Sequence, residues 1–238
     1  MRTRSPFKLV LLITVLCCSV TASAQTRFTY DGGYAATYAR NNAWMAYGSG
    51  YNQNPFTSFQ NNCANFVSQA IMAGMVRKTN PREVFNRRYD FIADRTSQNT
   101  AYKWFFISSG DRGPAWAGAK ELYQYAIYNQ PSYRGLHFSF VAFDTPWSRS
   151  LNAFYLKPGD VIFCDWEHDG KIDHVLMVAR IDLSLFARTH YDRIRVAGQS
   201  NNHTDTALQY ILDKNYQDNK TWASFRVYRP VDYNQAGK

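Results

Sequence analysis

This 238-residue sequence has no long apolar run, only four cysteines and no cluster of like charges. The longest apolar stretch, Leu9 to about Val20, is about half of the ~20 residues that a membrane-spanning helix needs, so we expect no integral membrane segment. Lysine and arginine are scattered along the chain, which argues against nucleic acid as a partner. Repeats and low-complexity linkers are also absent, so we expect residues 25–238 to form one domain.

The N-terminal segment has the layout of a cleaved secretory signal. A positively charged opening precedes the apolar run, and Ala22-Ser23-Ala24 then supplies an A-x-A arrangement of small residues. We therefore expect residues 1–24 to be a signal peptide and the protein to be secreted or periplasmic. Without the three positive charges of that segment, the net charge falls from +9 to about +6, which suits contact with an anionic envelope surface.

Cysteine is scarce, and the four residues differ in setting. Cys17 and Cys18 lie in the signal; they allow a lipid-anchor interpretation, although neither follows a small residue. Cys164 ends the apolar run Val161–Cys164, where a thiol acts as a small hydrophobe. Cys63 lies among polar residues. These settings suggest that Cys63 is a reactive thiol and that Cys164 is a packing residue. The alternative, in an oxidising compartment, is a disulfide between Cys63 and Cys164.

The spacing of apolar residues predicts an α+β fold, because one early helix precedes several short strands. Aromatic residues make up 16% of the chain and charged residues only 19%, which is a globular composition rather than a disordered one. Residues 48–60 read as a loop, and residues 79–154 are hard to interpret. The pattern predicts helices at 34–47, at 63–73 with Gly74 as the C-cap, and at 115–128, and strands at 161–164, 174–181, 194–199 and 224–228.

Cys63 is the candidate nucleophile because it stands at the start of a predicted helix. Backbone N–H groups in a first helical turn lack intrahelical partners, and the helix dipole is positive there. Both effects favour the reactive thiolate, and the same N–H groups can hold an oxyanion. Asn61 and Asn62 suit the helix N-cap. Asn62 and Gln60 are candidates for oxyanion support, and Tyr51, in the preceding loop, is a candidate for substrate contact.

His174 is the candidate base, since a thiol nucleophile usually works with an imidazole. It begins a predicted strand directly after a polar turn, which places it at a sheet end. The other four histidines lie in a turn, in poorly defined segments or, for His203, in an Asn-rich loop. A third group should orient the imidazole; Gln199 and Asn201 share one face after the next strand, and alternation does not choose between them.

The sequence resembles the putative amidase domain family of the papain-like (NlpC/CHAP-type) cysteine hydrolases. The blocks that carry the resemblance follow the family's order along nearly the whole chain: Tyr34-Ala35-Ala36-Thr37-Tyr38-Ala39, Asn54-Pro55-Phe56, Asn62-Cys63-Ala64-Asn65-Phe66-Val67-Ser68-Gln69-Ala70, Ala115-Trp116-Ala117-Gly118-Ala119, Pro158-Gly159-Asp160-Val161-Ile162, Asp169-Gly170-Lys171-Ile172-Asp173-His174-Val175 and Gln199-Ser200-Asn201-Asn202. The block around Cys63 is specific to the family, whereas the Gly-Asp-Val-Ile block alone is weak evidence.

The resemblance implies a papain-like fold in which the nucleophile-bearing helix packs on an antiparallel sheet. It also implies that Cys63 is the nucleophile, His174 the base and Gln199 the third residue. The sequence departs from the family twice: Asn62 stands where Asp is usual, and Gln199 where His is usual. The implied activity is hydrolysis of amide bonds in peptides or peptidoglycan stem peptides. Acyl transfer through the same thiol and a non-catalytic envelope-binding module are the alternatives.

The segment Asp165–Asp173 carries oxygen ligands at alternate positions, as calcium loops do, but Leu176 occupies the position where such a loop needs a bidentate Glu. Asp169-Gly170 is also a strong hairpin-turn signal. We expect a turn, with no metal and no cofactor. The sequence says nothing about oligomeric state.

Overall fold

The computed structural model describes residues 27–45, 54–96, 103–128, 135–145, 151–184, 189–219 and 222–234. The expected signal peptide, with Cys17 and Cys18, and the candidate substrate contact Tyr51 lie outside these residues. Within the described ranges, no helix is both long enough and apolar enough to cross a membrane.

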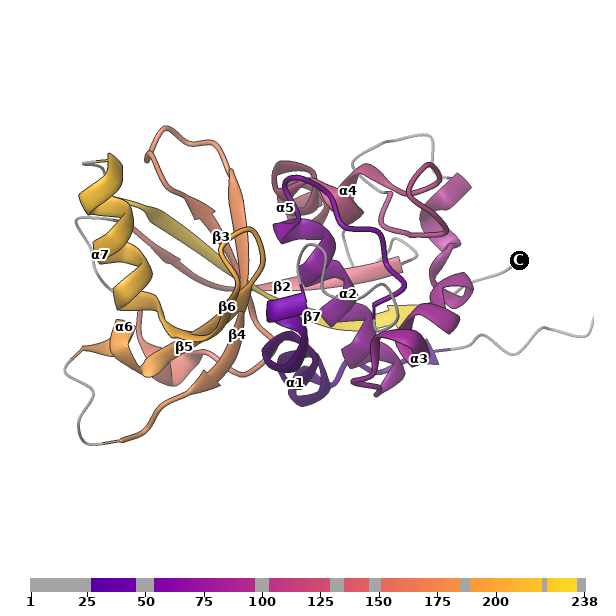
Figure 1. Cartoon of the computed structure of the whole chain (residues 1–238), viewed down its shortest axis with the longest axis horizontal. Coiled ribbons are helices and arrows are strands. Elements are labelled where there is room, and N and C mark those ends of the chain that lie inside the picture. The colour runs from indigo at the N-terminus through magenta and orange to yellow at the C-terminus, as the bar shows by residue number, and fades with distance from the viewer. Residues whose placement is uncertain are drawn as a thin grey trace, which may run out of the picture.

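An antiparallel sheet of seven strands forms the centre of the structure (Figure 1). Its strands run in the order β1-β7-β3-β4-β5-β6, and β2 also pairs with β7. The strands are β1 (Arg27–Phe28), β2 (Gly135–Asp144), β3 (Val161–Asp165), β4 (His174–Ile181), β5 (Ile194–Gly198), β6 (His203–Ala207) and β7 (Ser224–Asn234). Together with the helices they give the predicted α+β architecture.

Helices cover both faces of this sheet, as Figure 1 shows: α1, α2, α4 and α5 lie on one side and α7 on the other. The α-helices are α1 (Gly32–Asn42), α2 (Cys63–Val76), α3 (Pro81–Asn86), α4 (Pro114–Ala117), α5 (Ala119–Tyr128), α6 (His190–Arg193) and α7 (Leu208–Asn219). Short 3-10 helices occupy Ala43–Met45, Arg88–Phe91, Ala93–Thr96 and Ala153–Tyr155.

Two hydrophobic clusters, one on each face, hold these layers together. Alternate residues of a strand point to opposite faces. Val161 and Phe163 therefore join the cluster that includes Cys63 and Phe66 of α2, while Ile162 and Cys164 join the cluster that includes Leu208 of α7. Every residue of β3 is consequently buried, which explains its unbroken apolar run.

Most predicted elements are confirmed, with shifted boundaries. The prediction that Gly74 caps α2 is wrong: the helix continues to Val76, and Arg77 takes the left-handed C-cap conformation with φ 53°. Gly74 serves close packing instead, because a Cβ there would lie 2.7 Å from the Tyr30 ring. The helix predicted over 115–128 is broken at Gly118. Pattern analysis missed β2, β6 and α7.

Candidate active site

Cys63 is the first residue of α2, as predicted, and the helix start is left without a side-chain cap. Asn62 occupies the N-cap position, but its side chain makes no cap hydrogen bond. The Asn62 carbonyl accepts from the Phe66 N–H at 2.9 Å, which closes the first turn. The backbone N–H groups of Cys63 and Ala64 therefore receive no side-chain cap from Asn62, and they lie close enough to the Cys63 sulfur to lower the thiol pKa.

A third N–H group reaches the thiol from the start of β4. The Val178 N–H donates to the Asp160 carbonyl at 2.8 Å, so even-numbered residues of β4 direct their N–H groups toward β3 and odd-numbered residues direct theirs toward β5. Met177 pairs with Ala197, but β5 ends at Gly198. Within the described residues the Val175 N–H therefore has no partner in β5, and it lies near enough to the Cys63 sulfur to lower the thiol pKa.

The Cys63 thiol is 5% exposed, and its burial controls its acidity. Burial raises the pKa of the Cys63 thiol, and the nearby Asp173 charge raises it further. The N–H groups of Val175, Ala64 and Cys63 lower the pKa but do not cancel the effect of burial. The expectation that the helix start favours a thiolate at rest is therefore wrong in its net direction, because desolvation of the charged form outweighs the hydrogen bonds.

His174 is the first residue of β4, directly before Val175. Because strand residues alternate, the His174 side chain lies on the face of Leu176 and Val178, toward α7, whereas Val175 lies on the face that packs against Cys63. The His174 imidazole lies with its centroid 5.8 Å from the Trp166 ring. No hydrogen bond joins the imidazole to the Cys63 sulfur within the described residues. Burial, together with the nearby His203, lowers the pKa of His174 to about 4, so the imidazole is neutral at pH 7.

His203 is the residue that sequence reasoning missed. It begins β6 and pairs with Gly198, and the electrostatic interaction between the two imidazoles places it near His174. Burial lowers the pKa of His203, and Lys214 of α7 lowers it further. One sequence signal could have found it: like His174, it follows a polar turn and starts a strand.

Gln199 and Asn62 are hydrogen-bonded to each other, although 137 positions separate them. The Asn62 amide donates to Gln199 Oε1, and Gln199 Nε2 donates to the carbonyls of Asn42 and Ala43 at 3.3 Å each. Gln199 is 2% exposed, whereas Asn201 is exposed, so burial separates the two candidates that alternation did not. The buried Gln199 amide holds α1 and the start of α2 rather than the His174 imidazole.

Gln60 is exposed and makes no hydrogen bond within the described residues, and Tyr51 falls outside them. Cys63 and Cys164 are both free, so the structure does not contain the alternative disulfide. Cys164 is fully buried in the cluster on the α7 face, as expected of a packing residue.

The segment Asp165–Asp173 forms a turn closed by its own first carboxylate. Asp165 accepts from the Asp169 and Gly170 N–H groups at 3.0 Å each, and from the Ser224 hydroxyl at 3.2 Å. These donors occupy oxygens that a calcium ion would need. Across the described part of the chain, no three His, Cys, Asp or Glu side chains are grouped so that they could hold a metal ion.

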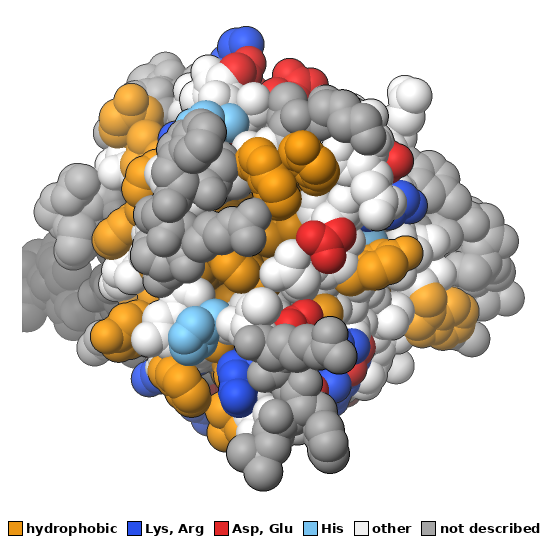
Figure 2. Space-filling view, turned by 90° about the vertical axis from the view of Figure 1, so that its left-hand side faces the viewer, with side chains coloured by type: hydrophobic (Ala, Val, Ile, Leu, Met, Phe, Trp, Pro, Cys, Tyr) orange, Lys and Arg blue, Asp and Glu red, His pale blue; other side chains and the backbone are white. Residues whose placement is uncertain are grey.

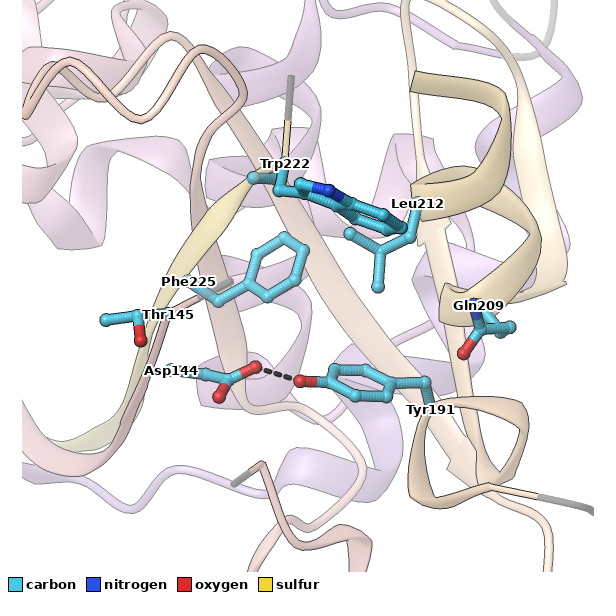
Figure 3. Close-up of a pocket in the computed structure, with 8 residues that line it drawn as sticks. Asp144, Thr145, Tyr191, Gln209, Leu212, Trp222 and Phe225 are labelled. Atoms are coloured by element: carbon cyan, nitrogen blue, oxygen red, sulfur yellow. Dashed lines mark hydrogen bonds between the residues drawn. The ribbon is translucent and has the colours of Figure 1, made fainter. Parts of the chain in front are cut away.

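A small hollow of about 20 Å³ lies on the α7 side of the sheet. Its lining includes Trp222, Leu212 and Phe225, together with Tyr191, whose hydroxyl donates to Asp144 (Figure 3). Phe225 also packs against Trp166 at 6.0 Å, which connects the hollow to the His174 ring. Figure 2 shows hydrophobic side chains exposed over the middle of this side of the molecule.

A family model described as a putative amidase domain matches residues 29–226, a range that contains Cys63, His174, Gln199 and His203. No curated protein and no solved structure matches the chain. The description of the matched family points to hydrolysis of amide bonds.

Proposed function

The chain belongs to the putative amidase domain family, and from that membership we propose that it is an exported cysteine hydrolase with a papain-like (NlpC/CHAP-type) fold. Cys63 is the nucleophile and His174 is the base. One geometric observation carries this proposal: Cys63 is the first residue of α2, whose N-terminus has no side-chain cap, and the nearby backbone N–H groups of Cys63, Ala64 and Val175 lower the thiol pKa. A set of N–H donors stabilises negative charge where a thiolate and an oxyanion form.

The first half of the reaction produces a thioester. The Cys63 thiol transfers its proton to the neutral His174 imidazole while the sulfur attacks the amide carbonyl carbon. The carbonyl oxygen becomes an oxyanion, which the N–H groups at the start of α2 hold. The C–N bond then breaks, and the leaving amine takes the proton from His174. A raised thiol pKa and a His174 pKa of about 4 make the resting pair neutral, so general-base removal of the proton is required.

The second half of the reaction releases the acid. A water molecule gives a proton to His174 and attacks the thioester carbonyl, the C–S bond breaks, and the sulfur recovers the proton. Both steps require the imidazole to move from Trp166, on the α7 face, around the end of the sheet to the thiol, a movement open to His174 because it is the first residue of β4. His203 lies near His174 and is a better candidate for orienting it than Gln199, whose amide is bonded elsewhere.

Peptides, and peptidoglycan stem peptides in particular, are the proposed substrates. The signal-like residues 1–24 and the net positive charge support an exported protein that acts at an anionic envelope. The loop before α2, which contains Gln60 and Tyr51, is proposed to contact the substrate, because it leads directly into Cys63. Sequencing the N-terminus of the exported protein tests the export step; an intact residue 1 contradicts it, and Gln25 at the N-terminus supports it.

Digestion of purified peptidoglycan and of model peptides tests the activity. Cys63→Ala should abolish release of new amine termini, whereas Cys164→Ala, the matched change at the buried packing thiol, should retain it. Mass spectrometry after iodoacetamide treatment should find Cys63 modified before Cys164. Equal cleavage by wild type and Cys63→Ala would refute the cysteine mechanism. Transfer products in place of free acid would establish the acyltransferase alternative, and an unreactive Cys63 would favour a binding module.

A further inference from the structure

Three side-chain amides beside Cys63 form a continuous hydrogen-bonded chain. Trp116 Nε1 donates to Asn65 Oδ1 at 2.6 Å, and Asn65 Nδ2 donates to Asn62 Oδ1 at 2.8 Å. Asn62 Nδ2 then donates to Gln199 Oε1, and Gln199 Nε2 donates to the backbone carbonyls at the end of α1. All four side chains are at least 98% buried, so water cannot replace these bonds.

The two ends of this hydrogen-bonded series, the Trp116 indole and the α1 carbonyls, fix which way each amide between them is oriented. An indole N–H is only a donor and a backbone carbonyl is only an acceptor. Asn65 must therefore present oxygen to Trp116, and Gln199 must present nitrogen to the α1 carbonyls. Each amide between them donates through nitrogen and accepts through oxygen. A carboxylate in place of any of the three amides would leave two oxygens facing each other.

We propose that this hydrogen-bonded series of Trp116, Asn65, Asn62 and Gln199, called the amide chain below, positions the Cys63 nucleophile. Its middle members flank Cys63 in sequence. The amide chain ties the start of α2 to the end of β5 and to the end of α1. Because the Asn62 side chain bonds Gln199 and Asn65, it does not cap α2, and the first-turn N–H groups stay free for the sulfur. This inference rests on the proposed role of Cys63.

A pair of tryptophans offers a matched test. Trp104 and Trp116 are both fully buried, and each donates its indole N–H to a side chain of α2: Trp104 to Ser68 Oγ at 3.0 Å, and Trp116 to Asn65. Phenylalanine at either position keeps a packed ring and removes the donor. Trp116→Phe and Trp104→Phe should therefore lower thermal stability to a similar degree, and only Trp116→Phe breaks the amide chain.

The measurement is the rate at which iodoacetamide alkylates Cys63 in the folded protein at a series of pH values. Mass spectrometry then gives the extent of alkylation. Trp116→Phe should slow alkylation of Cys63 at pH 7 by about three- to fivefold and move the profile to higher pH, since the N–H groups of a helix start contribute an effect of that size. Trp104→Phe should leave the profile of the wild type unchanged. Equal profiles for Trp116→Phe and wild type overturn the proposal, and so does an equal change in both variants.

Gln199→Glu provides a second variant in case Trp116→Phe fails to fold. Its carboxylate cannot donate to the α1 carbonyls, so we expect the same shift of the alkylation profile to higher pH; an unchanged profile contradicts the proposal. Peptide cleavage by the wild type separates the two hypotheses. An active wild type whose variants keep the normal profile refutes the positioning role alone, whereas a wild type with unreactive Cys63 refutes the proposed function.

Discussion

Asp94 should make the stability of this protein fall as the pH rises toward 8. Its side chain is fully buried, and burial raises its pKa to about 8, although the Tyr125 hydroxyl donates to Oδ2 at 2.6 Å and favours the charged form. Oδ1 has no hydrogen-bond partner within the described residues. A Cβ on Gly135 would lie 2.4 Å from Oδ1, so the carboxyl group is tightly enclosed. A neutral carboxyl group fits this site, and a carboxylate does not.

The size of the effect follows from proton linkage. The folded state keeps the Asp94 proton up to about pH 8, whereas the unfolded chain releases it near 3.8. The folded state therefore binds more protons between these values. The stabilisation is complete below the unfolded pKa and is lost as the pH rises through the folded pKa. Each pH unit within the window costs about 1.4 kcal/mol, or roughly 3 to 4 kcal/mol between pH 5 and pH 8.

Asp94→Asn tests this reasoning, because an amide keeps an oxygen acceptor for Tyr125 and does not titrate. Urea unfolding of both proteins at pH 5, 6, 7 and 8 gives the free energy of unfolding at each pH. The wild type should lose stability across this range relative to the variant, and the variant should be the more stable protein at pH 8. Parallel curves for the two proteins would show that Asp94 does not titrate as the burial predicts.

Three shorter predictions concern the base, its pH range and a turn. His174→Ala should reduce kcat/KM for peptide cleavage by about 10² to 10⁴, the usual contribution of a general acid–base group; His190→Ala, at an exposed position, should retain activity, and equal losses would exclude His174 as the base. Because the neutral imidazole is the active form and its pKa is about 4, kcat/KM should fall only as the pH drops through about 4; a fall near pH 6.5 would contradict this. Gly159→Ala should destabilise the fold by roughly 3 kcal/mol in urea unfolding, because φ is +91° and the new Cβ would lie 2.4 Å from Gly32 Cα. Gly170→Ala, with φ +88° and open space, should cost only about 1 kcal/mol, and similar losses at both glycines would refute the steric argument.

The two departures from the family's pattern are Asn62 and Gln199, and they show what the sequence can predict and what only the structure reveals. Each residue was found from the sequence alone, and each was assigned a separate role. The structure joins them by a hydrogen bond. An amide at one position therefore fits an amide at the other, a relation that no local pattern contains because 137 residues lie between them.

The sequence by itself determined the features that depend on neighbouring residues. Apolar spacing of three and four predicted α2 and placed Cys63 at its first turn, and β-branched runs predicted β3 and β4, because periodicity and capping act within a few positions. The tertiary structure alone decided the features that depend on strand register and burial. It ended β5 one residue before Gln199, which leaves the Val175 N–H without a partner in β5 and near the thiol, and it set His203 near His174. It also reversed the expected acidity of Cys63, since desolvation depends on every element packed around the sulfur and not on the helix start alone.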